Sequence, residues 1–171
     1  MSAAPHKIPM LVVSKMSRAQ FVGVLGGIFE HSPWVAEQAW EARPFRTREA
    51  LHEAMMTAVA ASPEARILEL LCAHPDLGTR LAVTDYSASE QQGAGLDRLT
   101  PEEYGTFSAA NRAYVDKFGF PFILAVRGKT KDDILEAMKA RQANEPAAER
   151  AEALAQIKQI TGWRLADLLG A

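Results

Sequence analysis

The sequence contains little cysteine, no marked excess of charge of either sign and no long apolar run. Cys72 is the single cysteine among 171 residues, which excludes an internal disulfide and a zinc site built from cysteines. The 19 lysine and arginine residues nearly balance 21 aspartate and glutamate residues, so the net charge of -2 predicts no binding of nucleic acid. The apolar runs are too short to cross a membrane. A reduced, buried Cys72 thiol in a cytoplasmic protein is the simplest interpretation.

Several catalytic motifs are missing as well. The 4 histidines never pair with the spacing His-x-x-x-His, so the sequence predicts no metal site. No glycine-rich phosphate loop follows a strand-like run, and the nucleophile elbow Gly-x-Ser-x-Gly is absent. These absences disfavour a metalloenzyme, a nucleotide-binding loop and a serine hydrolase of the elbow type.

Helix-initiation signals recur along the chain. Ser17 with Gln20, and Thr100 with Glu103, have the spacing of a capping box, and Thr130 is a further N-cap candidate. Together with the apolar spacing they predict helices at about 17–30, 32–42, 47–60, 62–73, 87–95, 100–117, 130–141 and 146–169. We therefore expect an all-α, single-domain bundle of about eight helices over residues 1–171, with residues 1–13 as a loose tail.

One segment, at about 119–127, does not have the pattern of a helix. The run Phe120-Pro-Phe-Ile-Leu-Ala-Val126 is apolar, lies between Gly119 and Gly128, and is too short for a globular helix, so it is predicted to be extended. No other run forms a convincing strand, so its backbone groups need side chains, water or a ligand as partners. It is either a buried apolar segment or a ligand-binding wall that ends in Arg127, a possible anchor for an anion.

His74 is the first candidate for chemistry. It follows an apolar helix and precedes Pro75, which disfavours the helical conformation at His74 and places the imidazole at a helix exit. The ordinary pKa of a histidine, about 6.5, suits proton transfer at neutral pH. The alternative is a histidine that bonds to the last carbonyl groups of its helix.

Ser87, Glu90 and Gln91 form the second candidate group. Their spacing places an alcohol, a carboxylate and an amide on one side of a helix, where they could hold a small polar ligand. Ser87 and Glu90 also have the spacing of a capping box, so both could simply satisfy backbone donors at a helix start.

Taken together, these segments resemble the 2-oxo-4-hydroxy-4-carboxy-5-ureidoimidazoline (OHCU) decarboxylase family over roughly residues 14–169. The matching motifs occur in order and differ in kind. They are Leu25-Gly-Gly-Ile-Phe-Glu-His-Ser-Pro-Trp34, Arg43-Pro-Phe45, His74-Pro-Asp-Leu-Gly78, Ser87-x-x-Glu90-Gln91-x-x-Ala94-Gly95-Leu96 and Phe118-Gly-Phe-Pro-Phe-Ile123.

The resemblance implies an all-α, usually homodimeric enzyme that uses no cofactor or metal and converts a small ureide to (S)-allantoin in urate breakdown. It implies that His74 is the general acid or base and that Glu90 orients the substrate. It also implies a set of substrate-binding residues: Pro75, Ser87, Gln91, Phe122, Ile123, Leu124, Ala125, Val126 and Arg127. Of these, residues 122–126 are expected to contribute mainly their backbone.

Two other functions are compatible with the same residues. A non-catalytic helical module could bind a small metabolite or a partner through the same residues, or a related enzyme could hydrolyse another ureide. One departure from the family pattern is the short stretch between Gly78 and Ser87, which is longer in some relatives. We expect residues 79–86 to form one rim of the pocket.

Overall fold

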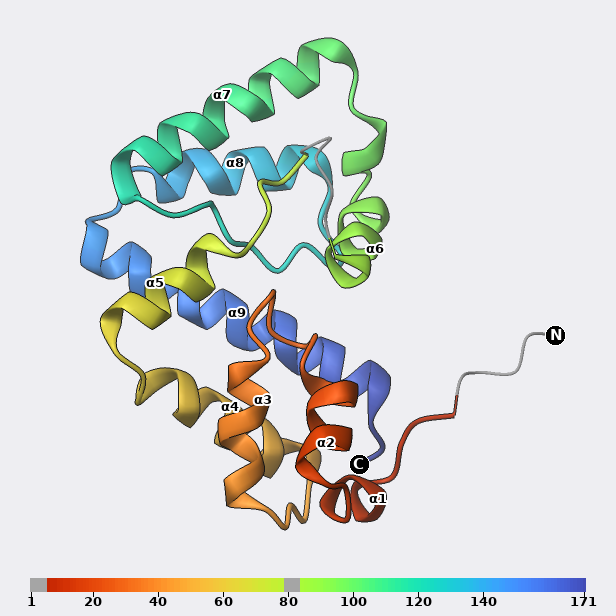
Figure 1. Ribbon diagram of the computed structural model, residues 1–171. Coiled ribbons are helices and arrows are strands. Elements are labelled where there is room, and N and C mark those ends of the chain that lie inside the picture. Colours follow the sequence, from red (N-terminus) through yellow and green to blue (C-terminus); the bar gives the residue numbers. More distant parts are fainter. Residues whose placement is uncertain (1–5, 79–83) are drawn as a thin grey trace, which may run out of the picture. The chain divides into compact units, whose positions relative to one another are not determined.

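Helices dominate the structure, a computed structural model that describes residues 6–78 and 84–171. Apart from helices, the described ranges contain only one isolated bridge, between Ile8 and Leu169, which confirms the predicted all-α class (Figure 1). The chain falls into two units, one of Met1–Leu70 with Lys158–Ala171 and the other of Leu71–Ile157. Helices α5 (Glu64–Cys72) and α9 (Pro146–Leu168) contribute residues to both units.

The first unit is built from short helices, most of which bury apolar side chains. Its elements are α1 (Met10–Ser14), α2 (Arg18–Leu25), α3 (Trp34–Ala39), the short 3-10 helix η1 (Trp40–Ala42), α4 (Arg48–Ala60), most of α5 and the end of α9. Phe21 and Leu51 are fully buried, and the Phe21 ring stacks on Phe45 with the ring centroids 5.9 Å apart. Burial of such side chains supplies most of the stability of short helices.

The N-terminal residues differ from the loose tail expected over residues 1–13. Ile8 donates its N–H to the carbonyl of Leu168 at 3.0 Å and accepts from the N–H of Gly170 at 2.8 Å. Met10 and Val13 of α1 are buried. Backbone pairing with the end of α9 therefore holds residues 8–14, a long-range contact that local sequence does not reveal; residues 1–5 lie outside the described part.

A buried ion pair lies inside the first unit. Arg164 on α9 is 2% exposed and places its Nη2 2.8 Å from Oε1 of Glu30, which is 1% exposed. Its Nη1 donates to the carbonyl of Ile28 at 2.9 Å. Because buried charges are costly unless they are paired and hydrogen-bonded, this contact fixes the loop after α2 on the C-terminal part of α9.

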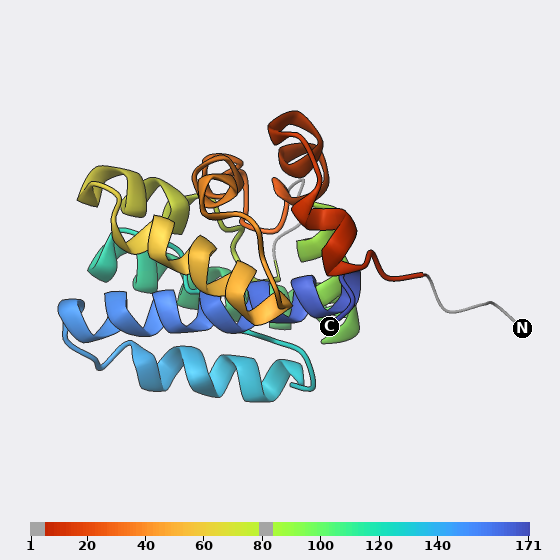
Figure 2. The ribbon, with the colours of Figure 1, turned by 90° about the horizontal axis from the view of Figure 1, so that it is seen from below.

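The second unit contains every residue that the sequence assigns to a site. Its elements are the end of α5, α6 (Asp85–Gly93), the 3-10 helix η2 (Leu96–Arg98), α7 (Pro101–Phe118), α8 (Lys131–Arg141) and α9 up to Ile157. Helices α8 and α9 run antiparallel and share a short connection (Figure 2). Tyr114 is fully buried, with its ring centroid 5.3 Å from that of Phe122.

Three predicted helix starts are confirmed as capping boxes, at Ser17, Thr100 and Thr130. The eight predicted helices all have counterparts, although α2 ends at Leu25 instead of residue 30 because Gly26 and Gly27 follow it. Within the described ranges, no helix combines the length and the hydropathy that crossing a bilayer would require.

Replacement of Gly105 by alanine is expected to stabilise the protein. It lies inside α7 on an exposed surface, and a Cβ added there would meet no atom within 4 Å. We expect Gly105→Ala to raise the free energy of unfolding by about 0.5–1 kcal/mol, since alanine loses less backbone entropy in a helix. Gly119 at the end of α7 is the control, because its φ of 79° makes Gly119→Ala destabilising by about 1–2 kcal/mol despite equally open space. Urea unfolding of both variants tests the opposite signs.

Candidate functional site

The His74 loop leaves α5 where the sequence predicts a helix exit. The backbone N–H of His74 donates to the carbonyl of Leu71 at 3.3 Å, and His74 is only 8% exposed. Gly78 ends this loop with a φ of 76°, and a Cβ there would lie 2.9 Å from Cδ1 of Leu99. The positive φ favours glycine at that position, and any side chain there would be strained.

Helix α6 begins earlier than predicted. Its N-cap is Thr84, whose hydroxyl accepts from the N–H of Ser87 at 3.3 Å. The alternative in which Ser87 and Glu90 form a capping box is therefore excluded, because both residues lie inside the helix. Ser87 and Gln91 lie one turn apart and are buried, with 5% and 7% of their surface exposed. Glu90 lies between them in the helix, and Thr84 has the capping role. Of the predicted rim at 79–86, residues 79–83 lie outside the described part of the chain.

Two hydrogen bonds fasten the His74 loop to its neighbours. The N–H of Gly78 donates to Oε1 of Gln91 on α6 at 3.0 Å, and Nδ2 of Asn111 on α7 donates to the carbonyl of Leu77 at 2.9 Å. Gln91 therefore connects the histidine loop to the helix that carries Glu90. Its Nε2 has no hydrogen-bond partner among the described residues, so this buried amide keeps a donor for a ligand. Sequence reasoning missed Asn111, which has no local signal.

The extended segment starts beside the exit of α5. Gly119 and Gly128 bound it, both with a φ of 79°, and residues 122–126 between them are buried. Sγ of Cys72 lies 3.5 Å from the carbonyl oxygen of Gly119, which brings the start of this segment close to the helix end that precedes His74. The prediction of a buried Cys72 is wrong, since the residue is exposed; partial burial of the thiol nevertheless raises its pKa.

The far end of the segment lies near α6. A cavity of about 320 Å³ is lined by residues 93–95 and Arg98 from the end of α6 and its following turn, and by residues 129–131. Arg127, two residues before this lining, is exposed. The extended segment therefore runs from the end of α5, which precedes His74, to the end of α6, which carries Glu90.

Part of the segment's backbone is already bonded to protein side chains. The carbonyl of Ile123 accepts from Nη1 of Arg141 at 2.6 Å, and the N–H of Ala125 donates to Oε1 of Gln156 at 2.9 Å. The predicted contacts of a ligand with the backbone of all five residues therefore need revision for these two groups. Arg141 and Gln156 carried no sequence signal, because each lies far along the chain from the segment.

A second polar cavity lies next to the His74 loop. It has a volume of about 410 Å³ and is lined by Asp76 and Gly78 from the loop and by polar residues of α7, including Tyr104 and Asn111. Burial raises the pKa of Asp76. The buried Oδ1 of Asn111 has no hydrogen-bond partner among the described residues.

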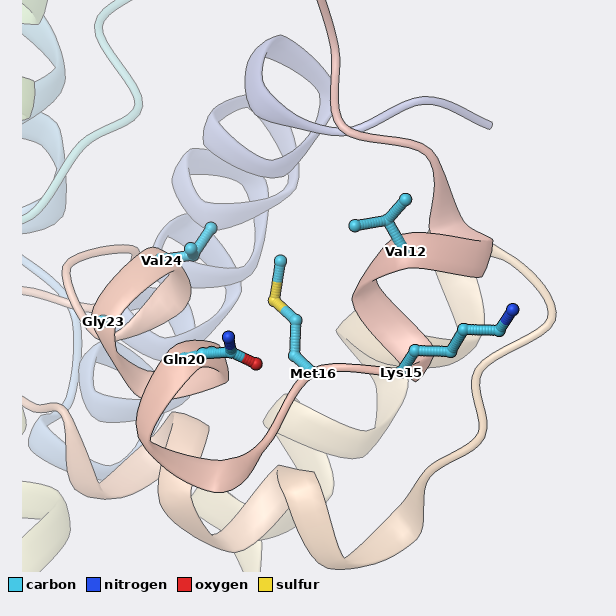
Figure 3. A pocket seen from close by; sticks show the side chains of 6 residues that line it. All are labelled: Val12, Lys15, Met16, Gln20, Gly23 and Val24. Atoms are coloured by element: carbon cyan, nitrogen blue, oxygen red, sulfur yellow. The ribbon is translucent and has the colours of Figure 1, made fainter.

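The first unit holds a cavity of a different kind. It has a volume of about 500 Å³ and is lined mainly by apolar atoms of α1, α2 and the turn between them, with the Met16 side chain reaching into it (Figure 3). None of its lining residues belongs to the predicted site.

Glu49 and His52 in the first unit have the Glu-x-x-His spacing of some metal ligands. His52 Nε2 lies 2.9 Å from the Thr161 hydroxyl, and burial lowers the pKa of this histidine. No cluster of three metal-binding side chains occurs within residues 6–78 and 84–171.

Comparison with known proteins identifies the family. The family model for OHCU decarboxylase matches residues 14–166. The OHCU decarboxylase of Haloferax volcanii is 41% identical over 162 residues, which cover 95% of this chain and 96% of that protein. The uric acid degradation bifunctional protein PucL of Bacillus subtilis is 44% identical over 157 residues, or 92% of this chain.

This chain spans only 32% of the length of the bifunctional Bacillus subtilis protein. A crystal structure of (S)-allantoin synthase superposes with a TM-score of 0.78 at 35% identity, covering 95% of this chain and 54% of that chain. Sequence identity and fold agree over nearly the whole chain, and the chain belongs to the OHCU decarboxylase family.

Proposed function

We propose that this protein decarboxylates OHCU to (S)-allantoin in urate degradation, with its own side chains and without a metal or organic cofactor. The observation that carries the proposal is the family membership, because the match over residues 14–166 includes every residue assigned below. The same match spans both units of the fold, which supports the prediction that they act as a single functional domain.

The chemistry of the substrate explains why no cofactor is required. Its carboxylate and hydroxyl groups share one ring carbon, and the neighbouring carbon is doubly bonded to nitrogen. When the bond to the carboxylate breaks and CO2 leaves, its electron pair forms a double bond to that neighbour, and the C=N electrons move to nitrogen. The nitrogen takes up a proton, and a second proton adds to the neighbouring carbon as the hydroxyl loses its own proton and becomes a carbonyl. The protein needs to supply orientation, proton transfer and exclusion of water.

Glu90 and His74 are assigned the two central roles. Glu90 holds the substrate hydroxyl and places negative charge near the departing carboxylate, which destabilises the bound substrate more than the transition state. His74 either removes the hydroxyl proton or delivers a proton to the new stereocentre. The hydrogen bond between Gly78 and Gln91 supports this pairing, because it joins the loop of His74 to the helix of Glu90.

The remaining predicted residues hold the ureide. Gln91 has its oxygen engaged by Gly78, so its Nε2 is the group that donates to a substrate oxygen. Ser87 lies one turn before it on α6, and Pro75 directly follows His74 in the loop. Arg127 contacts a ring or ureido oxygen; contact with the leaving carboxylate would stabilise the ground state and slow the reaction.

The test of the activity generates the unstable substrate in place from urate. We expect optical activity of (S)-allantoin to appear faster and in enantiomeric excess only when this protein is present, together with release of CO2. Racemic allantoin at the uncatalysed rate, or ammonia and ring-opened products, would instead favour a binding module or a ureide hydrolase.

Glu90→Gln tests the carboxylate separately from the shape of the site. We expect kcat to fall about 10-fold to 100-fold, since a hydrogen bond to a charged group contributes about 1.5–3 kcal/mol. Because Thr84 and not Ser87 caps α6, the substitution removes no cap and should leave thermal stability nearly unchanged. Glu136→Gln on the exposed face of α8 is the matched control. Full activity of Glu90→Gln would remove the carboxylate charge from the mechanism.

Two further properties are proposed on the basis of the sequence. The family resemblance supports a homodimer, which sedimentation equilibrium of the purified protein tests by its mass. The single thiol supports a cytoplasmic location.

A further inference from the structure

The two occupied backbone groups of the extended segment lie on the same edge. In an extended chain the N–H and C=O of one residue point to one edge, and those of the next residue point to the other. Ile123 and Ala125 are two residues apart, and their bonded groups are held by Arg141 and Gln156. The segment passes along α8 and α9, which carry these two side chains (Figure 1).

The opposite edge belongs to Phe122, Leu124 and Val126. The carbonyl of Val126 accepts from the N–H of Lys129 in the following turn. For the N–H and C=O of Leu124, and for the N–H of Val126, no hydrogen-bond partner occurs among the described residues. Leu124 is only 8% exposed and Val126 4%, and buried backbone groups without partners are rare. These groups therefore call for a ligand or water.

The Arg141 side chain is held in place by Glu149. Its Nε donates to Oε1 of Glu149 at 2.6 Å, and Glu149 is fully buried. Glu149 also accepts from the Tyr114 hydroxyl and, at 3.0 Å, from Nδ2 of Asn144. The guanidinium additionally lies over the Phe122 ring, with Cζ 4.4 Å from the ring centroid. Nη2 of Arg141 also lies 2.5 Å from Oε1 of Glu149, so this ion pair holds the side chain whose Nη1 bonds the Ile123 carbonyl.

Gln156 is oriented in a similar way. Its Nε2 donates to Oε1 of Glu152 at 2.8 Å, one helical turn earlier on α9. This bond determines which end of the amide is the acceptor, so Oε1 faces the N–H of Ala125.

We propose that Arg141 and Gln156 are positioning residues, which hold one edge of the segment so that Leu124 and Val126 present the other edge to the ureide. The inference rests on the proposed function and deepens it. A ureido group carries an N–H beside a C=O, and the N–H and C=O of Leu124 form the complementary pair. The sequence predicted ligand contacts with the backbone of all of residues 122–126. We now expect them only with the backbone groups of the Leu124 edge, because the Ala125 N–H is already bonded to Gln156.

Gln156→Ala is the direct test in the full-length protein. Loss of the hydrogen bond to the Ala125 N–H should lower kcat/KM about 10-fold, mainly through a higher KM, because the Leu124 edge is then poorly placed. Gln159→Ala, an exposed change of the same kind on α9, is the matched control and should retain wild-type kinetics. The double variant E152Q/Q156E restores both hydrogen bonds with the partners exchanged and should recover activity to within about 3-fold.

Backbone amide NMR provides a readout that does not depend on turnover. Addition of (S)-allantoin to the wild type should shift the amide resonances of Leu124 and Val126 more than that of Ala125. The Ala125 amide should exchange slowly with solvent in the wild type and faster in Gln156→Ala. A protein that decarboxylates OHCU but shows wild-type kinetics for Gln156→Ala, or an Ala125 amide that responds most to ligand, overturns this inference alone. Absence of turnover in the wild type overturns the proposed function.

Discussion

His74→Ala is expected to lower kcat/KM for OHCU by about 100-fold to 10,000-fold, the range that general acid-base catalysis contributes. The structure places His74 at a helix exit, on a loop tied to α6 through Gly78 and to α7 through Leu77. Both ties use backbone groups of the loop, so removal of the imidazole leaves them in place and the protein should still fold. The measurement is turnover of OHCU generated from urate, with circular dichroism as the check on folding.

His6→Ala is the matched control, because His6 is exposed and belongs to no predicted site. A folded His74→Ala protein with near-native turnover would remove His74 from catalysis. His74→Asn distinguishes the non-catalytic alternative: a binding module keeps its affinity for (S)-allantoin after this change, while its wild type shows no turnover.

Arg164→Met should cause the largest loss of stability, about 3–5 kcal/mol, because it removes the cation that pairs with the buried Glu30 carboxylate. Both side chains are almost completely buried, and the guanidinium bonds to the Glu30 carboxylate and the Ile28 carbonyl. At about 2–4 °C per kcal/mol for a chain of this size, the melting temperature should fall by roughly 6–20 °C. Thermal unfolding followed by circular dichroism measures the loss.

The double variant E30Q/R164M removes the uncompensated charge and should regain part of the lost stability. Arg112→Met, a change of an exposed arginine on α7, serves as the control. A change of less than about 1 kcal/mol in Arg164→Met would mean that the ion pair contributes little.

Local patterns predicted much of the fold. The capping boxes at Ser17 and Thr100 depend on residues three apart, so they can be recognised without tertiary information. The extended segment was predictable because Gly119 and Gly128, which take positive φ angles in the structure, interrupt the helical pattern on either side of an apolar run. The start of α6 was misplaced because both Thr84 and Ser87 are chemically able to cap a helix.

The sequence predicted the motif residues of the site but not the side chains that support them. The motif residues were named from the resemblance, and the structure places them all in the unit Leu71–Ile157. Their roles, including convergence of His74 and Glu90 on one substrate, remain predictions. The side chains that support the motifs, among them Asn111 and Gln156, were missed, because a single amide residue on a helix has no local pattern that indicates its partner.

The helical class, the positions of most helix starts, the interruption at residues 119–128 and the family could all be predicted from the sequence, since each depends on short-range spacing or on ordered motifs. Three features required the folded structure: Arg164 pairs with Glu30, Ile8 pairs with the end of α9, and Arg141 and Gln156 bond one edge of the extended segment. Those contacts join residues that are distant in the chain. Many other residues have the same chemistry, and only the folded chain determines which of them are buried next to each other.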